Sequence, residues 1–170
     1  MTAIKMMAVG RKLVNVYSGL SLPICKKYGI NQSCFDVLMF CANNPEYNTA
    51  RDICAVRGIK SGIASVAVET LIKKELLVRR DDPSDRRIRR LYPTEKADGI
   101  IADGRKMQKD FAAALRKGIT AEEEEIFERV NEKILDNIML FASEDQKCVE
   151  KLLYALLPVS AQVSEQASPV

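Results

Sequence analysis

The chain of 170 residues contains no histidine, and this absence removes several kinds of chemistry together. Histidine is the commonest general base in enzymes and a member of the Ser-His-Asp and Cys-His arrangements. It is also a frequent ligand in zinc fingers and related metal sites. We therefore expect a protein that is not an enzyme and that holds neither a metal ion nor a cofactor.

The cysteines do not form a metal or disulfide pattern, because the sequence has no Cys-x-x-Cys pair and their number is odd. Free thiols are expected, and Cys34 and Cys41, seven residues apart on an apolar helix, should lie in the core. A redox-sensing alternative stays open for Cys25, since the neighbouring Lys26 and Lys27 could lower its pKa. The five cysteines are Cys25, Cys34, Cys41, Cys54 and Cys148.

Long apolar runs are also missing, and none approaches the roughly 20 residues that cross a bilayer. The amino terminus soon reaches Arg11 and Lys12, which leaves no room for a signal-peptide core. Hydrophobic residues make up 47% and charged residues 29% of the chain, as in ordinary globular proteins. We expect a cytoplasmic protein without a membrane partner.

The most informative segment is Arg79–Arg90, which holds six arginines and three aspartates. The rest of the chain is balanced, with 20 basic and 20 acidic residues. Apolar residues flank the segment, and its centre, Asp-Pro-Ser-Asp, is typical of a turn, so a hairpin is predicted. One interpretation is a loop that only keeps the protein soluble. The exclusive use of arginine favours instead a polyanion, double-stranded DNA, since the guanidinium suits phosphate and groove contacts.

Apolar residues at helical spacing predict four helices before this segment. The last two are joined at Gly58 by a tight turn, as in a helix-turn-helix, and the fourth begins with small side chains that suit a DNA groove. The expected helices cover 2–20, with a break or kink at Ser21-Leu22-Pro23; a stretch capped by Asn31 and stopped at Asn43; a stretch from Asn48 to Gly58 that buries Ala50 and Ile53; and a stretch from Lys60 to Glu75.

Further helices are predicted after the hairpin. One opens at Pro93-Thr94-Glu95 and ends before Gly118, and a second begins at the capping box Thr120–Glu123. A short helix is expected around 148–157, followed by a disordered tail. Acidic residues outnumber basic ones by ten to three over 122–150, whereas basic residues lead by seven to three over 51–80. One pole of the molecule should therefore face DNA.

A helix-turn-helix followed directly by a hairpin predicts a mainly α fold with a small β-hairpin wing, a winged helix-turn-helix. At roughly residues 10–141 the chain resembles the MarR family of bacterial transcriptional regulators. The resemblance is carried by Asp85-x-Arg87 followed after five residues by Pro93–Ala97, by Ile59–Val78, and by Tyr28–Gln32. The chain departs from the family pattern at Glu75, where glycine is frequent, and at Val66, where arginine is frequent.

The resemblance implies a homodimer that binds a pseudo-palindromic operator, acts as a repressor, and is released by a small molecule or an oxidant. The implied divisions are a dimerisation helix at 1–30, a DNA-binding lobe at 31–95, dimerisation helices at 96–158 and a disordered tail at 159–170. The dimer would bury two apolar stripes, and the alternative is that these stripes are only intrachain core. They consist of Leu13, Val16 and Leu20, and of Phe127, Val130, Ile134 and Ile138.

The DNA-binding residues implied by the resemblance fall into three groups. Those expected in the major groove are Ser61, Gly62, Ile63, Ser65 and Val66. Arg87 is expected in the minor groove, with Asp85 holding the wing by pairing with a neighbouring arginine. Phosphate contacts, or in part structural partners of Asp81 and Asp82, are Arg79, Arg80, Arg86, Arg89 and Arg90, and Thr49 would place a backbone amide against phosphate.

Two further hypotheses remain open. A winged helix can also bind another protein without operator DNA, and a steep salt dependence would argue against this alternative. A small-molecule effector would sit in a cleft between the dimer helices and the DNA-binding lobe. Its lining could include Tyr17, Cys25, Tyr28 and Met39, each of which ordinary core packing explains equally well.

Overall fold

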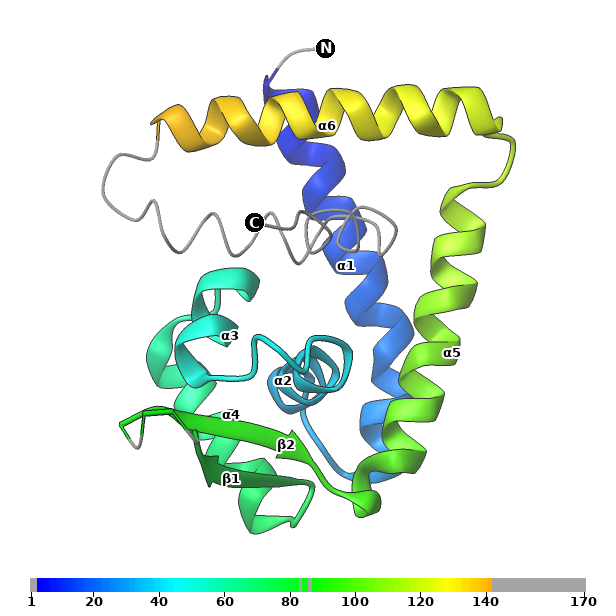
Figure 1. Cartoon of the computed structure of the whole chain (residues 1–170). Helices are drawn as coiled ribbons and strands as arrows, with labels where there is room; N and C mark the ends of the chain where they lie inside the picture. Colours follow the sequence, from blue (N-terminus) through cyan, green and yellow to red (C-terminus); the bar gives the residue numbers. More distant parts are fainter. Residues whose placement is uncertain (1–2, 83, 86, 142–170) are drawn as a thin grey trace, which may run out of the picture.

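The expected succession of helices and hairpin is present in a computed structural model of the chain, which describes residues 3–82, 84–85 and 87–141. The mainly α fold with a two-stranded wing is thereby confirmed. In Figure 1 the lobe containing the hairpin lies beside the carboxyl-terminal half of α1, and α6 crosses near the other end of α1. The elements are α1 Ala3–Tyr28, α2 Gln32–Asn43, α3 Ala50–Arg57, α4 Ser61–Lys73, β1 Leu77–Asp81, β2 Arg89–Pro93, η1 Glu95–Ala97, α5 Asp98–Leu115 and α6 Ala121–Phe141.

Helix α1 continues through Pro23, so of the break or kink expected at Ser21-Leu22-Pro23 the break is wrong. Proline lacks an N–H and removes one helical hydrogen bond, but tertiary contacts can hold the helix together. Here Ser21 is buried, and its hydroxyl lies 2.8 Å from the Ser18 carbonyl oxygen and 2.6 Å from Gln32 Oε1 of α2. The contact with Gln32 fixes the helix against α2 two residues before the proline.

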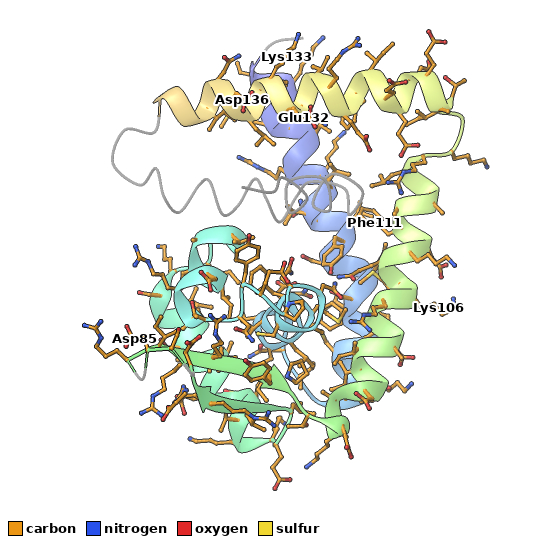
Figure 2. All side chains as sticks on the ribbon, viewed as in Figure 1. Asp85, Lys106, Phe111, Glu132, Lys133 and Asp136 are labelled. Atoms are coloured by element: carbon orange, nitrogen blue, oxygen red, sulfur yellow. The ribbon has the colours of Figure 1, made fainter. Side chains whose placement is uncertain are left out.

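Two neighbouring helices, α1 and α5, support the lobe from one side. Tyr17 of α1 meets Phe111 of α5 edge to face, with ring centroids 6.0 Å apart (Figure 2). At the carboxyl end of α1, Tyr28 Oη donates a hydrogen bond of 3.0 Å to Asp103 Oδ2, and Lys27 Nζ lies 2.7 Å from the same oxygen. The end of α1 is therefore tied to α5 close to the point where the chain enters the lobe.

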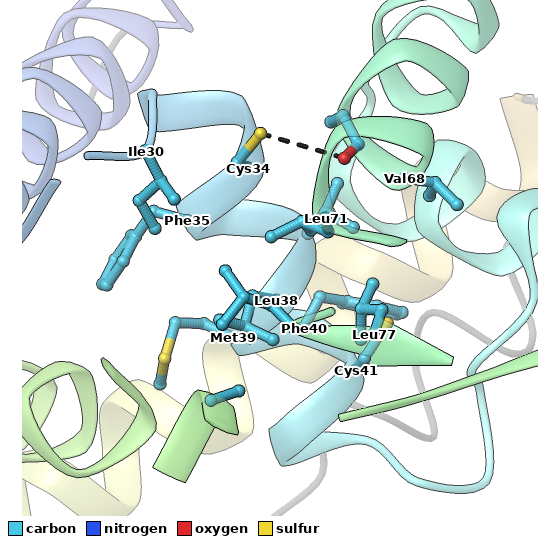
Figure 3. Close-up of a cluster of buried hydrophobic side chains, with 14 of the residues drawn as sticks. Ile30, Cys34, Phe35, Leu38, Met39, Phe40, Cys41, Val68, Leu71 and Leu77 are labelled. Carbon is cyan, nitrogen blue, oxygen red and sulfur yellow. Dashed lines mark hydrogen bonds between the residues drawn. The ribbon is translucent and has the colours of Figure 1, made fainter. Parts of the chain in front are cut away.

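Helix α2 forms the centre of the hydrophobic core (Figure 3). Asn31 caps it as expected, since its side chain accepts a hydrogen bond of 2.8 Å from the Cys34 amide. The core positions predicted for Cys34 and Cys41 are confirmed, because both are buried. Fully buried side chains from four elements meet there, namely Phe35 and Leu38 of α2, Val68 and Leu71 of α4, Leu77 of β1 and Ile100 of α5.

Helices α3 and α4 form the expected helix-turn-helix, joined at Gly58 in the left-handed conformation with φ of 61°. Thr49 and Asp52 form a capping box at the start of α3. Ile53 is fully buried as predicted, but Ala50 is exposed, and its expected burial is wrong. Ala50 is the first residue of α3, where the side chain points to solvent ahead of the contact with α4.

The wing is a regular antiparallel hairpin, in which Val78 pairs with Tyr92 and Asp81 with Arg89. Glu75 precedes it with φ of 61°, a left-handed conformation that favours glycine. The Thr94 hydroxyl donates a hydrogen bond of 2.6 Å to the Glu75 carbonyl oxygen, and Lys96 Nζ lies 2.8 Å from the Glu75 carboxylate. These contacts hold Glu75 in this conformation at the position where the resemblance led us to expect glycine.

Helix α6 begins at the predicted capping box, in which the Thr120 amide donates to Glu123 Oε2 at 2.8 Å and the Glu123 amide donates to Thr120 Oγ1 at 3.2 Å. Over residues 121–138, the part of α6 whose side chains are described, none is buried. The expected helix at 148–157 and the tail at 159–170 lie outside the described residues. Within the described ranges, no helix combines the length and apolar character needed to cross a membrane.

Candidate nucleic-acid interface

The amino-terminal half of α4 presents all five residues expected in the major groove to solvent. Burial of its other face, through Ala64, Ala67 and Val68, fixes the rotation of the helix against α2 and α3. Ile63 and Val66 are large apolar side chains that nevertheless remain 48% and 65% exposed. The exposed set is Ser61, Gly62, Ile63, Ser65 and Val66. A slim helix face without long side chains is thus directed outward, which suits entry into a groove about 12 Å wide.

The tip of the wing is organised by Asp85, whose expected pairing with a neighbouring arginine is present. Arg87 Nε and Nη2 lie 3.0 Å and 2.9 Å from the two carboxylate oxygens, and the Arg87 amide donates to Oδ1 at 2.9 Å. Hydrogen bonds from Arg87 hold the pKa of Asp85 below its usual range, so the carboxylate stays charged. Figure 2 places Asp85 at the end of the hairpin, and the Arg87 side chain is 90% exposed. Arg87 is therefore anchored at its base and open to a ligand.

The base of the wing is held by Arg90, which acts as a clamp between the hairpin and the loop before α3. It pairs with the buried Asp82, and its Nη1 donates to Asn48 Oδ1 at 3.1 Å and to the Glu46 carbonyl oxygen at 3.2 Å. Hydrogen bonds from Ser84, and then from Arg90, lower the pKa of Asp82. The sequence left two roles open for Arg90, a phosphate contact or a structural partner. The geometry supports the second role, with Asp82 as the partner.

The sequence interpretation missed Asn48, although this residue is central to the clamp. Asn48 is fully buried, its carbonyl oxygen accepts a hydrogen bond of 2.8 Å from the Leu91 amide, and its side chain accepts from Arg90. No local pattern marks it, because Arg90 is 42 residues away along the chain. The one signal that could have suggested this role is a polar residue just before a helix cap, because such a residue needs a specific hydrogen-bond partner when it is buried.

The remaining arginines of the segment have different surroundings. Arg79 Nη2 lies 2.6 Å from Glu69 Oε1, so this pair ties β1 to α4. Arg89 forms an exposed pair of 2.5 Å with Asp81, and Arg80 lies over the Tyr92 ring at 5.3 Å. Arg86, also expected to contact DNA, lies outside the described residues.

Thr49 lies where α3 meets the base of the wing. Its backbone forms an isolated bridge with Arg90, and its hydroxyl accepts the Asp52 amide at 3.1 Å. The Thr49 amide donates to Asp52 Oδ2 at 3.1 Å. The cap at the start of α3 is therefore present. Because the Thr49 amide already donates to Asp52, a phosphate contact at the start of α3 would use exposed residues next to Thr49.

The alternative that Lys26 and Lys27 lower the pKa of the Cys25 thiol does not fit the structure. Cys25 is buried, and this burial, together with the nearby negative charge of Asp36, raises the pKa of its thiol. Both lysines are exposed, and Lys27 extends to Asp103 on α5. Within the described ranges, no group of histidine, cysteine or carboxylate side chains is arranged to hold a metal ion.

A groove of about 600 Å³ lies between α1 and α5. Its walls are mainly apolar, and its lining includes Leu20, Met107 and Phe111 together with the charged side chains of Asp103 and Lys106. A second space of about 100 Å³ contains two of the residues expected at an effector cleft, Tyr17 and Met39. The other two, Cys25 and Tyr28, line neither of these spaces.

Both apolar stripes expected at a dimer interface are open to solvent in the single chain. In α1, Val16 is 51% exposed, and every described side chain from residue 4 to residue 16 is exposed. In α6, Phe127 is 64% and Ile138 52% exposed, whereas Ile134 is half-buried. Most side chains of these stripes therefore stay exposed in the single chain, which argues against the alternative that the stripes are only intrachain core.

Residues 28–88, which include the helix-turn-helix and most of the wing, match the sequence profile of the MarR family. Solved structures show a similar fold. A MarR transcriptional regulator from Methanosarcina mazei has 17% identity and a TM-score of 0.66, over 83% of this chain and 94% of that one. A MarR protein from Peptoclostridium difficile has 20% identity and a TM-score of 0.65, over 81% and 89%. CouR from Rhodococcus jostii has 21% identity and a TM-score of 0.59, over 82% and 90%. No curated protein matches the chain.

Proposed function

We propose that the chain is a homodimeric, sequence-specific repressor of the MarR family of transcriptional regulators, whose sequence profile matches residues 28–88. Two copies related by a twofold axis would present two α4 helices to successive major grooves of a pseudo-palindromic operator. Repression would follow from occupation of the operator. The wings would reach the flanking minor grooves through Arg87.

The observation that carries this proposal is the pairing of an exposed, slim α4 with an anchored arginine at the tip of the wing. Asp85 holds the Arg87 backbone and the near side of its guanidinium, while the side chain remains 90% exposed. Fixing an arginine before binding reduces the entropy lost when it enters a groove. Narrow A·T-rich minor grooves carry enhanced negative potential and attract such a side chain.

Dimerisation is supported by the two uncovered stripes, on α1 and α6. Isolated exposed apolar residues are ordinary, but contiguous stripes on long helices mark protein interfaces. Because α1 also supports the DNA-binding lobe, a dimer built on the α1 and α6 stripes would set the spacing between the two α4 helices. The spacing should match half-sites separated by about one turn of DNA, roughly 34–36 Å.

An effector site is supported by the groove between α1 and α5. Its volume of about 600 Å³ falls within the range of roughly 300–1,000 Å³ typical of small-molecule sites. CouR, one of the structural neighbours, was solved with p-coumaroyl-CoA bound. We propose that an organic molecule with an apolar body occupies the groove and changes how α1 and α5 support the lobe. Release through oxidation of Cys25 is not favoured, since that thiol is buried.

The test begins with selection of bound duplexes from a random DNA pool, followed by fluorescence-anisotropy titrations over a range of salt concentrations. Loss of Arg87 should weaken operator binding by about ten- to a hundredfold, the range expected for one groove-reading side chain, without unfolding the protein. The matched control is Arg116→Ala, which removes another exposed arginine paired with a carboxylate, Glu124, at the opposite end of α5 from the lobe.

Three results would contradict the proposal. Equal operator binding by wild type and Arg87→Ala would refute the role of the wing tip. Equal losses of operator affinity in Arg87→Ala and Arg116→Ala would show that Arg87 contributes only through its positive charge and not through its position in the groove. A pool that enriches no sequence, or binding that does not weaken as salt rises, would favour a winged-helix module that binds another protein.

A further inference from the structure

The outward face of α4 carries an unusual set of side chains for a helix that reads DNA. Between Ser61 and Thr70 the sequence contains no arginine, lysine, asparagine or glutamine. These four residue types make the bidentate hydrogen bonds that identify guanine and adenine in the major groove. This stretch of the helix therefore cannot recognise a purine edge in that way.

The polar groups that remain on this stretch discriminate weakly or are already engaged. Its one charged side chain, Glu69, is paired at 2.6 Å with Arg79 of the wing. The Thr70 hydroxyl donates a hydrogen bond of 2.7 Å to the Val66 carbonyl oxygen. The exposed hydroxyls of Ser61 and Ser65 can each donate or accept, so they can bond to several different base edges.

Two exposed aliphatic side chains are the groups on this stretch that can distinguish one base from another. Ile63 and Val66 are three residues apart, so they share one face of the helix, and they are 48% and 65% exposed. Their orientation is fixed, because Ala64, Ala67 and Val68 on the other face are almost fully buried. In the major groove, the base feature that makes an apolar contact is the C5-methyl group of thymine.

We propose that the protein selects its operator chiefly through thymine 5-methyl groups, contacted by Ile63 and Val66. This inference rests on the proposed DNA-binding function and names the chemistry that this site recognises. Burial of one methyl group changes affinity by about fourfold, so a contact repeated in both half-sites is worth about fifteenfold. Operator positions under α4 should accordingly be thymine on one strand.

The experiment uses the full chain and an operator enriched from the random pool. Thymines are replaced one position at a time, in both half-sites, by deoxyuridine, which lacks only the methyl group and keeps the base-pairing hydrogen bonds. We expect about a fifteenfold loss of affinity at each contacted position. The slope of affinity against salt should not change, because the phosphate contacts are untouched.

Variants assign the effect to the two residues. Ile63→Ala and Val66→Ala should bind the thymine operator more weakly, and each should abolish the difference between thymine and deoxyuridine at the position it contacts. Ile119→Ala is the matched control, since Ile119 is 50% exposed and belongs to the connection between α5 and α6. In Figure 1 this connection lies far from the hairpin. This variant should keep both the affinity and the thymine preference.

Each contrary outcome has a separate meaning. If an operator is enriched but deoxyuridine binds as tightly as thymine at every position, methyl recognition is wrong while the DNA-binding function stands. A thymine preference that persists in both Ile63→Ala and Val66→Ala would refute the assignment of these residues. If the pool enriches no sequence, the DNA-binding function itself is refuted.

Discussion

Replacement of Phe127 by alanine tests the proposed dimer at its most exposed aromatic side chain. Phe127 lies on α6 in one stripe with Val130, Ile134 and Ile138, and it is 64% exposed to solvent in the single chain. Full burial of a large apolar side chain contributes roughly 1.5–3 kcal/mol, so covering the exposed part of Phe127 would contribute roughly 1–2 kcal/mol. A twofold interface uses each residue twice, and Phe127→Ala should therefore weaken the dimer by roughly 2–4 kcal/mol.

This loss corresponds to an increase in the dimer dissociation constant of about thirty- to several-hundredfold. Sedimentation velocity over a dilution series would measure it directly. Glu132→Ala is the matched control, because Glu132 is exposed on the opposite side of the same helix and its replacement leaves the stripe intact. Circular dichroism would establish that both variants retain their helices.

Two results would refute the reasoning. If the wild-type chain sediments as a monomer at every concentration, the exposed stripes are not a dimer interface. If Phe127→Ala and Glu132→Ala dimerise equally well, the interface lies elsewhere and the α6 stripe has another role. An intermediate effect of Ile134→Ala, whose side chain is already half-buried, would strengthen the area argument.

Two further predictions concern side chains whose surroundings differ from their sequence interpretation. Arg89→Gln should reduce the slope of log affinity against log salt by about two, since its exposed guanidinium can reach one phosphate in each subunit, whereas Arg90→Gln should weaken binding and lower the thermal midpoint without changing that slope. With an alkylating reagent at neutral pH, peptide mapping should find Cys54 labelled well before Cys25 and Cys41. Burial raises the pKa of both latter thiols, that of Cys41 to about 12, so their reactive thiolate forms only at higher pH.

Features encoded by a few neighbouring residues could be predicted from the sequence. Asn31 and Thr120 cap the helices that they were expected to cap, and each does so through an amide three residues later. The turn at Gly58 and the arginine hairpin likewise depend on local conformational preferences. Together these signals were sufficient to predict a winged helix-turn-helix.

Features that depend on packing between distant segments could not be predicted in the same way. The continuation of α1 through Pro23 depends on contacts with α2, and the burial of Cys25 depends on how α1 lies against the core. Charge next to Cys25 suggested a reactive thiol, but burial has the larger effect on its pKa. The clamp at the wing base joins Arg90 to Asn48, and no sequence spacing links them.

The arginine segment illustrates why a count of charges is a poor guide to DNA affinity. Four of its described arginines have carboxylate partners, so the local positive field is smaller than six arginines imply; the pairs are Arg79–Glu69, Arg87–Asp85, Arg89–Asp81 and Arg90–Asp82. Exposed pairs contribute little stability, and a phosphate can therefore displace Asp81 from Arg89 at low cost. Arg90 is held by a buried carboxylate and two further acceptors, so the wing keeps its shape while Arg89 exchanges its partner. Burial rather than charge thus determines which arginines are available to DNA.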